Sequence, residues 1–247
     1  MLVEYDGAPF VGWQRQMGAL SVQEVLETAA AHLAGGAPVA SRAAGRTDAG
    51  VHAAGQVVEL ALDRPITAER LAEALNFHLK PHPVVVLRAT PAAPGWSARF
   101  SAIRRSYRYV ILNRRARPAL ELGHVWHLPG PLDAAAMGEA ARVLLGRHDF
   151  TSFRARACQA RSPLRTLDRL EVTRRGEHIE IIAEARSFLH HQVRNMVGTL
   201  RLVGEGRWTP AHMAAALAAC DRGAAGPTAP AAGLSLVSVG YKIDPFS

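Results

Sequence analysis

The chain has 247 residues, of which 49% are hydrophobic and 20% are charged, a composition typical of a folded globular protein. Lysine and arginine outnumber acidic residues by 29 to 21, which gives a formal net charge of +8. This charge favours a polyanionic partner, although a genome whose base composition favours arginine codons would give the same surplus. The only cysteines, Cys158 and Cys220, lie too far apart in sequence to indicate a zinc site or a disulfide framework, and no apolar run approaches the roughly 20 residues of a membrane-spanning helix.

The first half of the chain predicts alternating strands and helices. Ser21 and Glu24 form a capping-box pattern at the start of one helix, which ends at Gly35. Thr67 can cap a second helix that Pro81 ends. The strand candidates are short runs of apolar residues, the last of them expected to be buried: Leu2–Tyr5, Val39–Ala43, Gln56–Leu60 and Val84–Leu87. The order is β-α-β-β-α-β, the ferredoxin-like pattern.

The second half repeats this order with one additional helix. Asp133 can cap a helix that reaches Leu145, and Arg175-Gly176 predicts the turn of a hairpin. The remaining candidates are strands at 103–112, 167–173, 178–185 and 234–239, and helices at 190–203 and 210–220. We therefore predict an α+β fold of two ferredoxin-like halves, domains 1–101 and 102–247, with antiparallel or mixed sheets that flank a central basic cleft. Other α/β chains can be divided in the same way, so this division is a hypothesis.

A glycine-flanked loop, expected from Gly45 to Gly55, lies between two strand candidates of the first half. Its glycines allow a sharp turn and a close approach to a ligand. Arg46 and His52 place positive charge near Asp48 in sequence, and a nearby cation favours the ionised carboxylate that nucleophilic attack requires. From these residues alone, a simple turn in which Asp48 bonds its own backbone is favoured over a catalytic role.

The segment from Gly45 to His52, continued to Val57, resembles the signature of the TruA family, the tRNA pseudouridine synthase A enzymes. Five further segments match this family in its own order, from residue 3 to about residue 240: Val3–Gln16, Arg99–Tyr109, His148–Phe153, Phe188–Gly198 and Gly233–Val237. Because six matches in order are not expected by chance, the chain is identified as a member of this family, and the preference for a simple turn is reversed.

The resemblance implies an enzyme that isomerises uridine to pseudouridine at positions 38, 39 and 40 of the tRNA anticodon stem-loop. It implies no metal, ATP or redox cofactor, and Asp48 as the catalytic nucleophile. Attack at C1′, attack at C6 and a glycal route with Asp48 as base all remain open. It also implies tRNA as the partner and a homodimer. With no signal peptide evident at the start of the sequence, we expect a cytoplasmic protein without a membrane segment.

The resemblance also implies roles for residues outside the loop. Tyr107 is expected to stack on the flipped uracil, as aromatic faces receive extruded bases. Tyr109 has the same strand parity, so only the resemblance selects Tyr107. Arg194 is expected to pair with Asp48, and Arg46 to support base extrusion. The other expected contacts are Leu234 to the substrate, and Arg15, His52, Arg99, Arg108, His190 and His191 to RNA.

The densest run of positive charge begins in the strand candidate 103–112 and continues beyond it: Arg104, Arg105, Arg108, Arg114, Arg115 and Arg117. Strand alternation places Arg104 and Arg108 on one face and Arg105 on the other. One of these groups is expected to line the RNA cleft. The alternative is a solvated edge strand that charge protects from aggregation.

Two alternatives from other functional classes remain. A passive RNA-binding protein of two ferredoxin-like modules would stack bases on strand aromatics, but aromatic residues are only 6% of the chain and no RNP1 pattern occurs. A metal-dependent hydrolase would use His190 and His191 with Asp48 and His52. Adjacent histidines on a helix point about 100° apart, and no three-ligand zinc spacing occurs, so we predict no metal.

Overall fold

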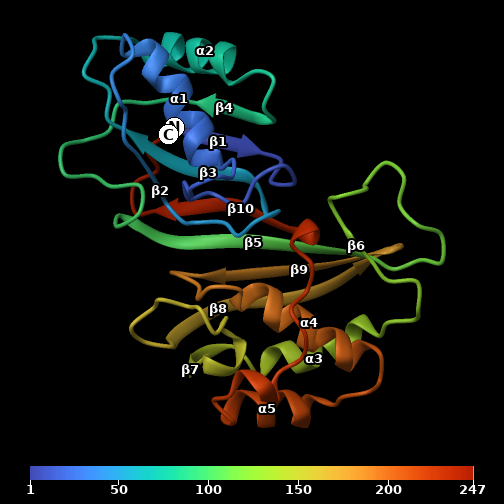
Figure 1. Ribbon diagram of the computed structural model, residues 1–247. Helices are drawn as coiled ribbons and strands as arrows, with labels where there is room; N and C mark the ends of the chain where they lie inside the picture. Colours follow the sequence, from blue (N-terminus) through green and yellow to red (C-terminus); the bar gives the residue numbers. More distant parts are fainter. Residues whose placement is uncertain (247) are drawn as a thin grey trace. The chain divides into compact units, whose positions relative to one another are not determined.

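The computed structural model describes residues 1–246, which form a mixed α/β structure with five α-helices in this range (Figure 1). The chain divides into two compact units. Unit 1 comprises Met1–Arg105 and the segment that begins at Ser235, and unit 2 comprises Ser106–Leu234. The domain ranges 1–101 and 102–247 remain a prediction. The units differ from these ranges in two ways: the boundary lies after Arg105, and the C-terminal segment joins unit 1, where its strand pairs with β3.

Unit 1 is built on a mixed sheet. Its elements are β1 (Leu2–Tyr5), α1 (Val22–Leu33), β2 (Ser41–Ala43), β3 (His52–Leu60), α2 (Ala68–Leu79), β4 (Val84–Arg88) and β10 (Leu234–Tyr241). The strands follow the order β4-β1-β3-β10, and β2 also pairs with β3. β1 is antiparallel to both β3 and β4, whereas β10 is parallel to β3.

Side-chain caps fix where the helices of unit 1 begin. The Ser21 hydroxyl accepts a hydrogen bond from the backbone N–H of Glu24 at 3.2 Å, and the Thr67 hydroxyl accepts one from Arg70 N–H at 3.4 Å. The two helices contact each other, and α2 also contacts β4 (Figure 1). The predicted starts of both helices are therefore confirmed.

The strand expected to be buried, β4, is buried on one face only. Val84 and Val86 are each 2% exposed, whereas Val85 and Leu87 are 42% and 46% exposed. Successive side chains of a strand point to opposite faces of the sheet; α2 contacts β4, and the alternate side chains Val85 and Leu87 face solvent. The expectation of a fully buried strand is wrong.

Unit 2 contains a second set of strands covered by three helices. Its elements are β5 (Ala102–Leu112, which begins in unit 1), β6 (Trp126–His127), α3 (Ala134–Arg142), β7 (Gly146–Asp149), β8 (Leu164–Arg175), β9 (His178–Ala185), α4 (Gln192–Gly204) and α5 (Pro210–Ala218). Three short 3₁₀ helices occupy Thr151–Phe153, Arg222–Ala224 and Ala231–Gly233. The strand order is β5-β9-β8-β7, with β6 parallel to β5. α3 contacts β8, α4 and α5 (Figure 1).

The predicted hairpin is confirmed: β8 and β9 are antiparallel, and Arg175 pairs with His178 across the turn. Asp133 caps α3 by accepting from Ala136 N–H at 2.9 Å, but the helix ends at Arg142, before the predicted Leu145. β6 and β7 were not predicted, because strands of two and four residues carry too short an alternation to detect. None of the helices within residues 1–246 is both long and apolar enough to cross a membrane.

Candidate active site

Asp48 lies in the segment that joins β2 to β3, residues 44–51, called here the Asp48 loop. The loop turns at Asp48, whose carbonyl accepts the backbone N–H of Val51 at 3.1 Å, and Gly50 adopts a φ of +74° within this turn. The Asp48 side chain is half-buried, Arg46 is exposed and Thr47 is buried. The loop is shorter than predicted because β3 begins at His52.

A buried hydrogen-bond network holds the loop from β1 and β3. The Tyr5 hydroxyl lies 2.7 Å from the Thr47 hydroxyl, one residue before Asp48. The amide of Gln56 donates to the carbonyl of Gly45 at 2.7 Å and reaches the Tyr5 hydroxyl at 3.5 Å. Burial raises the pKa of Tyr5 to about 12, so this phenol stays protonated at neutral pH and can serve as a donor.

The segment after β1 supports the loop from another side. Trp13 N–H donates to the carbonyl of Thr47 at 3.0 Å, and Gly50 N–H donates to the carbonyl of Phe10 at 3.2 Å. Gly12 has a φ of +104°, and a Cβ at this position would lie 2.6 Å from the Thr47 carbonyl oxygen. Glycine is therefore required here both by backbone conformation and by the close approach of the loop.

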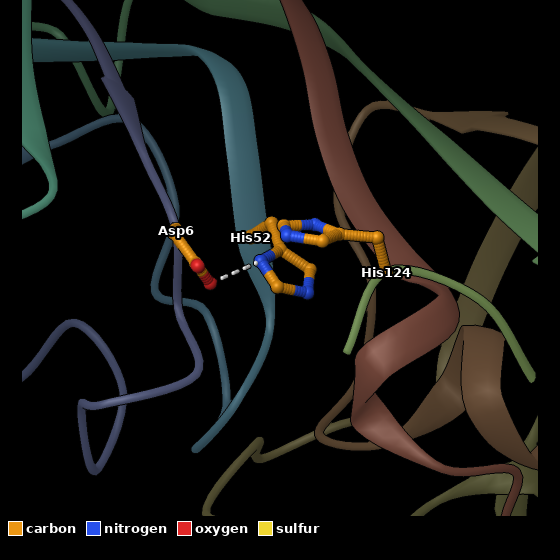
Figure 2. Close-up of side chains that lie close together, drawn as sticks. All are labelled: Asp6, His52 and His124. Carbon is orange, nitrogen blue, oxygen red and sulfur yellow. Dashed lines mark ion pairs between the residues drawn. The ribbon is translucent and has the colours of Figure 1, made fainter. Parts of the chain in front are cut away.

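His52, at the end of the loop, is tied to the end of β1. Its Nδ1 lies 2.9 Å from the Asp6 carboxylate and 3.1 Å from the backbone N–H of Gly7 (Figure 2). Nδ1 cannot serve both at once: a protonated Nδ1 donates to Asp6, and a bare one accepts from Gly7. Both states join His52 to the residues that directly follow β1. A Cβ at Gly7 would overlap the Val51 carbonyl, so the two segments are in close contact.

Arg105 anchors the start of the loop. Its guanidinium donates to the carbonyls of Ala44 at 2.6 Å, Arg99 at 2.8 Å and Ala102 at 3.3 Å, and the side chain is 8% exposed. Arg104 and Arg108 are exposed, as strand alternation predicts for the face opposite Arg105. The buried arginine of this run thus has a structural role in unit 1.

The two remaining arginines expected to contact RNA in unit 1 are exposed. Arg15 forms an ion pair with Glu27 at 3.7 Å. The guanidinium of Arg99 lies 5.4 Å from the centre of the Phe100 ring, which is itself 70% exposed. Both side chains are therefore accessible to a partner, in contrast to His52, which is 5% exposed.

Unit 2 carries the other predicted residues. Tyr107 is 8% exposed and packs edge-to-face on Phe188, with the ring centres 5.3 Å apart. Arg194, on α4, is half-buried and donates from Nε to the carbonyl of Ala229 at 2.8 Å. Leu234 is 4% exposed.

The predicted geometry of the adjacent histidines is wrong. His190 and His191 precede α4, which begins at Gln192, so helical spacing does not separate their rings. His191 has a left-handed φ of +63°, and the two ring centres lie 4.1 Å apart. His191 is the residue directly before α4, so neither histidine has the helical geometry on which the predicted 100° separation depends.

Comparison with known proteins gives the assignment. The family described as tRNA pseudouridine synthase matches residues 1–101 and 140–242 of the chain. A tRNA pseudouridine synthase A of Acidiphilium cryptum is 68% identical over 245 residues, which cover 99% of this chain and 96% of the relative. Proteins of the same name from Rhodospirillum centenum and Paramagnetospirillum magneticum are 60% and 59% identical over 241 residues, covering 98% of this chain and 98% and 94% of the relatives. The chain belongs to the tRNA pseudouridine synthase family.

The family match contains the whole Asp48 loop, together with Arg194 and Leu234, but residues 102–139 lie outside it. Tyr107 and Arg108 fall in this gap. The roles of these two residues are assigned from the resemblance of the segment Arg99–Tyr109 and from their positions in β5.

Sequence reasoning did not single out three residues that position the Asp48 loop: Tyr5, Gln56 and Arg105. Tyr5 resembles any aromatic residue of a core strand, and nothing local indicates that its hydroxyl meets Thr47. Tyr5 and Gln56 do lie in segments that resemble the family, but the resemblance gives them no role, and strand alternation only separates Arg105 from Arg104 and Arg108.

Proposed function

We propose that this protein isomerises uridine to pseudouridine at positions 38, 39 and 40 of the tRNA anticodon stem-loop, with Asp48 as nucleophile. The observation that carries the proposal is the 68% identity to a tRNA pseudouridine synthase A over nearly the whole chain. The geometry of unit 1 supports it, because hydrogen bonds from several neighbouring segments hold the backbone on both sides of Asp48.

The reaction conserves all atoms of the nucleotide. The N1–C1′ bond breaks, the uracil turns, and a C5–C1′ bond forms; C5 loses a proton and N1 gains one, so the product is an isomer of uridine. A carboxylate is sufficient for this chemistry, either as a nucleophile at C1′ or C6 or as the base of a glycal route. We assign no metal or organic cofactor to the reaction.

The other residues receive supporting roles in the proposal. Tyr107 stacks on the extruded uracil, and its packing on Phe188 supports this by fixing the plane of the ring. Arg194 pairs with Asp48 and orients its carboxylate. Arg46, which is exposed, supports base extrusion, and Leu234 contacts the substrate.

RNA contacts are assigned to the exposed side chains of the predicted set: Arg15, Arg99, Arg108 and His190, together with the half-buried His191. His52 is assigned instead to positioning of the loop. Its ring is buried and is bonded at the end of β1, so it offers RNA little surface.

We also propose that each half of the protein is ferredoxin-like, that the halves flank a basic cleft, and that the protein is a cytoplasmic homodimer. The strand order β4-β1-β3, with β2 on the far side of β3, supports the ferredoxin-like assignment for unit 1. The net charge of +8 supports a basic cleft.

The proposal is tested with unmodified tRNA transcripts that carry uridine at position 38, 39 or 40. Pseudouridine is mapped after incubation with the protein, and transcripts with cytidine at all three positions serve as controls. We expect pseudouridine at each of the three positions and none in the controls. Failure to modify any transcript would refute the proposed activity, and modification only at other positions would refute the proposed site specificity.

A further inference from the structure

Unit 2 contains a hollow of about 470 Å³ that is lined by basic side chains and by no acidic one. The basic side chains are those of Arg156, His191 and Arg222. The rest of the lining consists of alanine, glycine, proline and threonine residues. A volume of this size falls within the range of pockets that bind small organic groups.

Arg222 is held in place by neutral acceptors. Its Nη2 donates to Asn195 Oδ1 at 3.2 Å and to the Thr228 hydroxyl at 3.3 Å, and its Nη1 donates to the carbonyl of Ala225 at 3.3 Å. The neighbouring Asp221 caps the backbone N–H of Gly223 at 3.1 Å. The guanidinium is thus oriented without being neutralised.

Arg156 adds a second positive charge to the same hollow. Its side chain is exposed, and within residues 1–246 neither Arg156 nor Arg222 forms an ion pair with a carboxylate. Burial, and then the charge of Arg156, lowers the pKa of Arg222. Arg156 and Arg222 repel each other, and no acidic side chain of the described residues lines the hollow. The hollow therefore carries a net positive charge that a bound anion would balance.

We propose that this hollow binds a backbone phosphodiester of tRNA through the guanidinium groups of Arg156 and Arg222. The neutral partners of Arg222 orient its guanidinium and leave hydrogens on Nη1 and Nε to donate to phosphate oxygens, while Arg156 has no such partners in the part of the chain that the structure describes and can present its whole fork. This inference rests on the proposed function, which makes tRNA the polyanionic substrate. A contact of this kind fixes the position of the RNA and leaves the chemical step unchanged.

Binding is measured as the affinity for unmodified tRNA over a range of salt concentrations, with Arg156→Ala as the first variant. Arg156 makes no hydrogen bond that holds the fold within the described residues, so the variant is expected to fold as the wild type does. Loss of one phosphate contact is expected to weaken binding and to reduce the slope of log K against log salt by about 0.7–0.9. The kcat at saturating tRNA should stay within about two-fold of wild type, as expected for a phosphate contact that only positions the RNA.

Arg222→Lys keeps the positive charge but loses the planar guanidinium group. It should weaken tRNA binding, with a smaller change in the salt slope than Arg156→Ala. Arg142→Ala is the matched control, because it removes one arginine of unit 2 that is exposed and paired with Glu139 at 3.2 Å. Its affinity and slope should match those of wild type. Thermal melting of every variant checks that the fold is retained.

The proposal would be overturned if Arg156→Ala bound tRNA with the affinity and salt slope of the wild type. It would also be overturned if Arg142→Ala lost as much affinity and slope as Arg156→Ala. Inorganic phosphate, added at constant ionic strength, distinguishes a free anion from RNA. Suppose that phosphate raises the melting temperature of the wild type but not of Arg156→Ala, while both bind tRNA with the same affinity. The hollow then binds free phosphate, and the proposal is wrong. A wild-type protein that binds tRNA with the expected slopes but forms no pseudouridine would refute the proposed function alone.

Discussion

The Tyr5 hydroxyl lies 2.7 Å from the Thr47 hydroxyl and so joins strand β1 to the residue that precedes Asp48. Both side chains are buried, with exposed fractions of 3% and 6%. A hydrogen bond in such a place fixes the loop more firmly than one exposed to water, because neither group has a solvent partner to exchange with.

Tyr5→Phe is expected to lower both stability and turnover. The variant leaves the Thr47 hydroxyl buried beside an apolar ring, which costs about 1–3 kcal/mol in free energy of unfolding. A small displacement of the loop also misplaces the Asp48 carboxylate, so kcat should fall by about ten-fold or more while KM for tRNA changes little. Urea unfolding and steady-state kinetics measure the two effects.

Tyr241→Phe is the control for Tyr5→Phe. Its hydroxyl donates to the carbonyl of Ala98 at 2.7 Å in the same unit but does not bond the Asp48 loop. We expect a loss of stability, of about 1 kcal/mol, with kcat unchanged. Equal effects of the two variants on kcat would contradict a positioning role for Tyr5.

Gly12→Ala should be more harmful than Gly18→Ala. Both glycines have positive φ, +104° and +75°, and strain of this kind costs about 1–2 kcal/mol for a residue with a Cβ. Only at Gly12 would the Cβ meet the Thr47 carbonyl, whereas nothing lies within 4 Å at Gly18. Unfolding free energies should therefore differ between the variants, and only Gly12→Ala should reduce kcat. Identical unfolding free energies and rates would argue against the contact.

Alkaline pH is expected to destabilise the protein through Tyr5. Burial raises its folded-state pKa from 10.0 to about 12, so between these values the unfolded chain binds fewer protons than the folded one. Stability is therefore complete below pH 10 and is lost as pH rises toward 12, by up to about 3 kcal/mol. Unfolding free energies measured across this range should fall less steeply for Tyr5→Phe than for wild type. Parallel curves would show that Tyr5 titrates normally.

The sequence was most informative where local chemistry decides the structure. Ser21, Thr67 and Asp133 each cap the helix that their position predicts, because a short polar side chain before an apolar helix satisfies the first N–H groups. The hairpin at Arg175-Gly176 follows for a similar reason, since Gly176 adopts the positive φ of the turn.

Tertiary contacts decided the features that the sequence did not reveal. Residues 53–55, Ala-Ala-Gly, are poor strand formers, yet they belong to β3 because β1 and β10 pair on either side. The Asp48 loop was found from its motif, but its supports were not. Tyr5, Gln56 and Arg105 reach the loop from 42, 11 and 61 residues away in sequence, and such contacts leave no local pattern.

Chelators should not affect pseudouridine formation. The proposed isomerisation uses a carboxylate of the protein and needs no Lewis acid. Activity measured after dialysis against EDTA should equal that of the untreated protein. Loss of activity that added zinc or magnesium restores would favour the metal-dependent alternative, provided that the tRNA is refolded in the same buffer in every sample.

The most direct test of the account compares wild type with Asp48→Asn on an unmodified tRNA that contains uridine at positions 38, 39 and 40. Asparagine keeps the size of the side chain but removes the charge, so the loop and the affinity for tRNA should be preserved. We expect pseudouridine formation at saturating tRNA to fall by at least about 1,000-fold, as expected when a nucleophile is removed. Turnover close to that of wild type would contradict the assignment of Asp48 as the nucleophile.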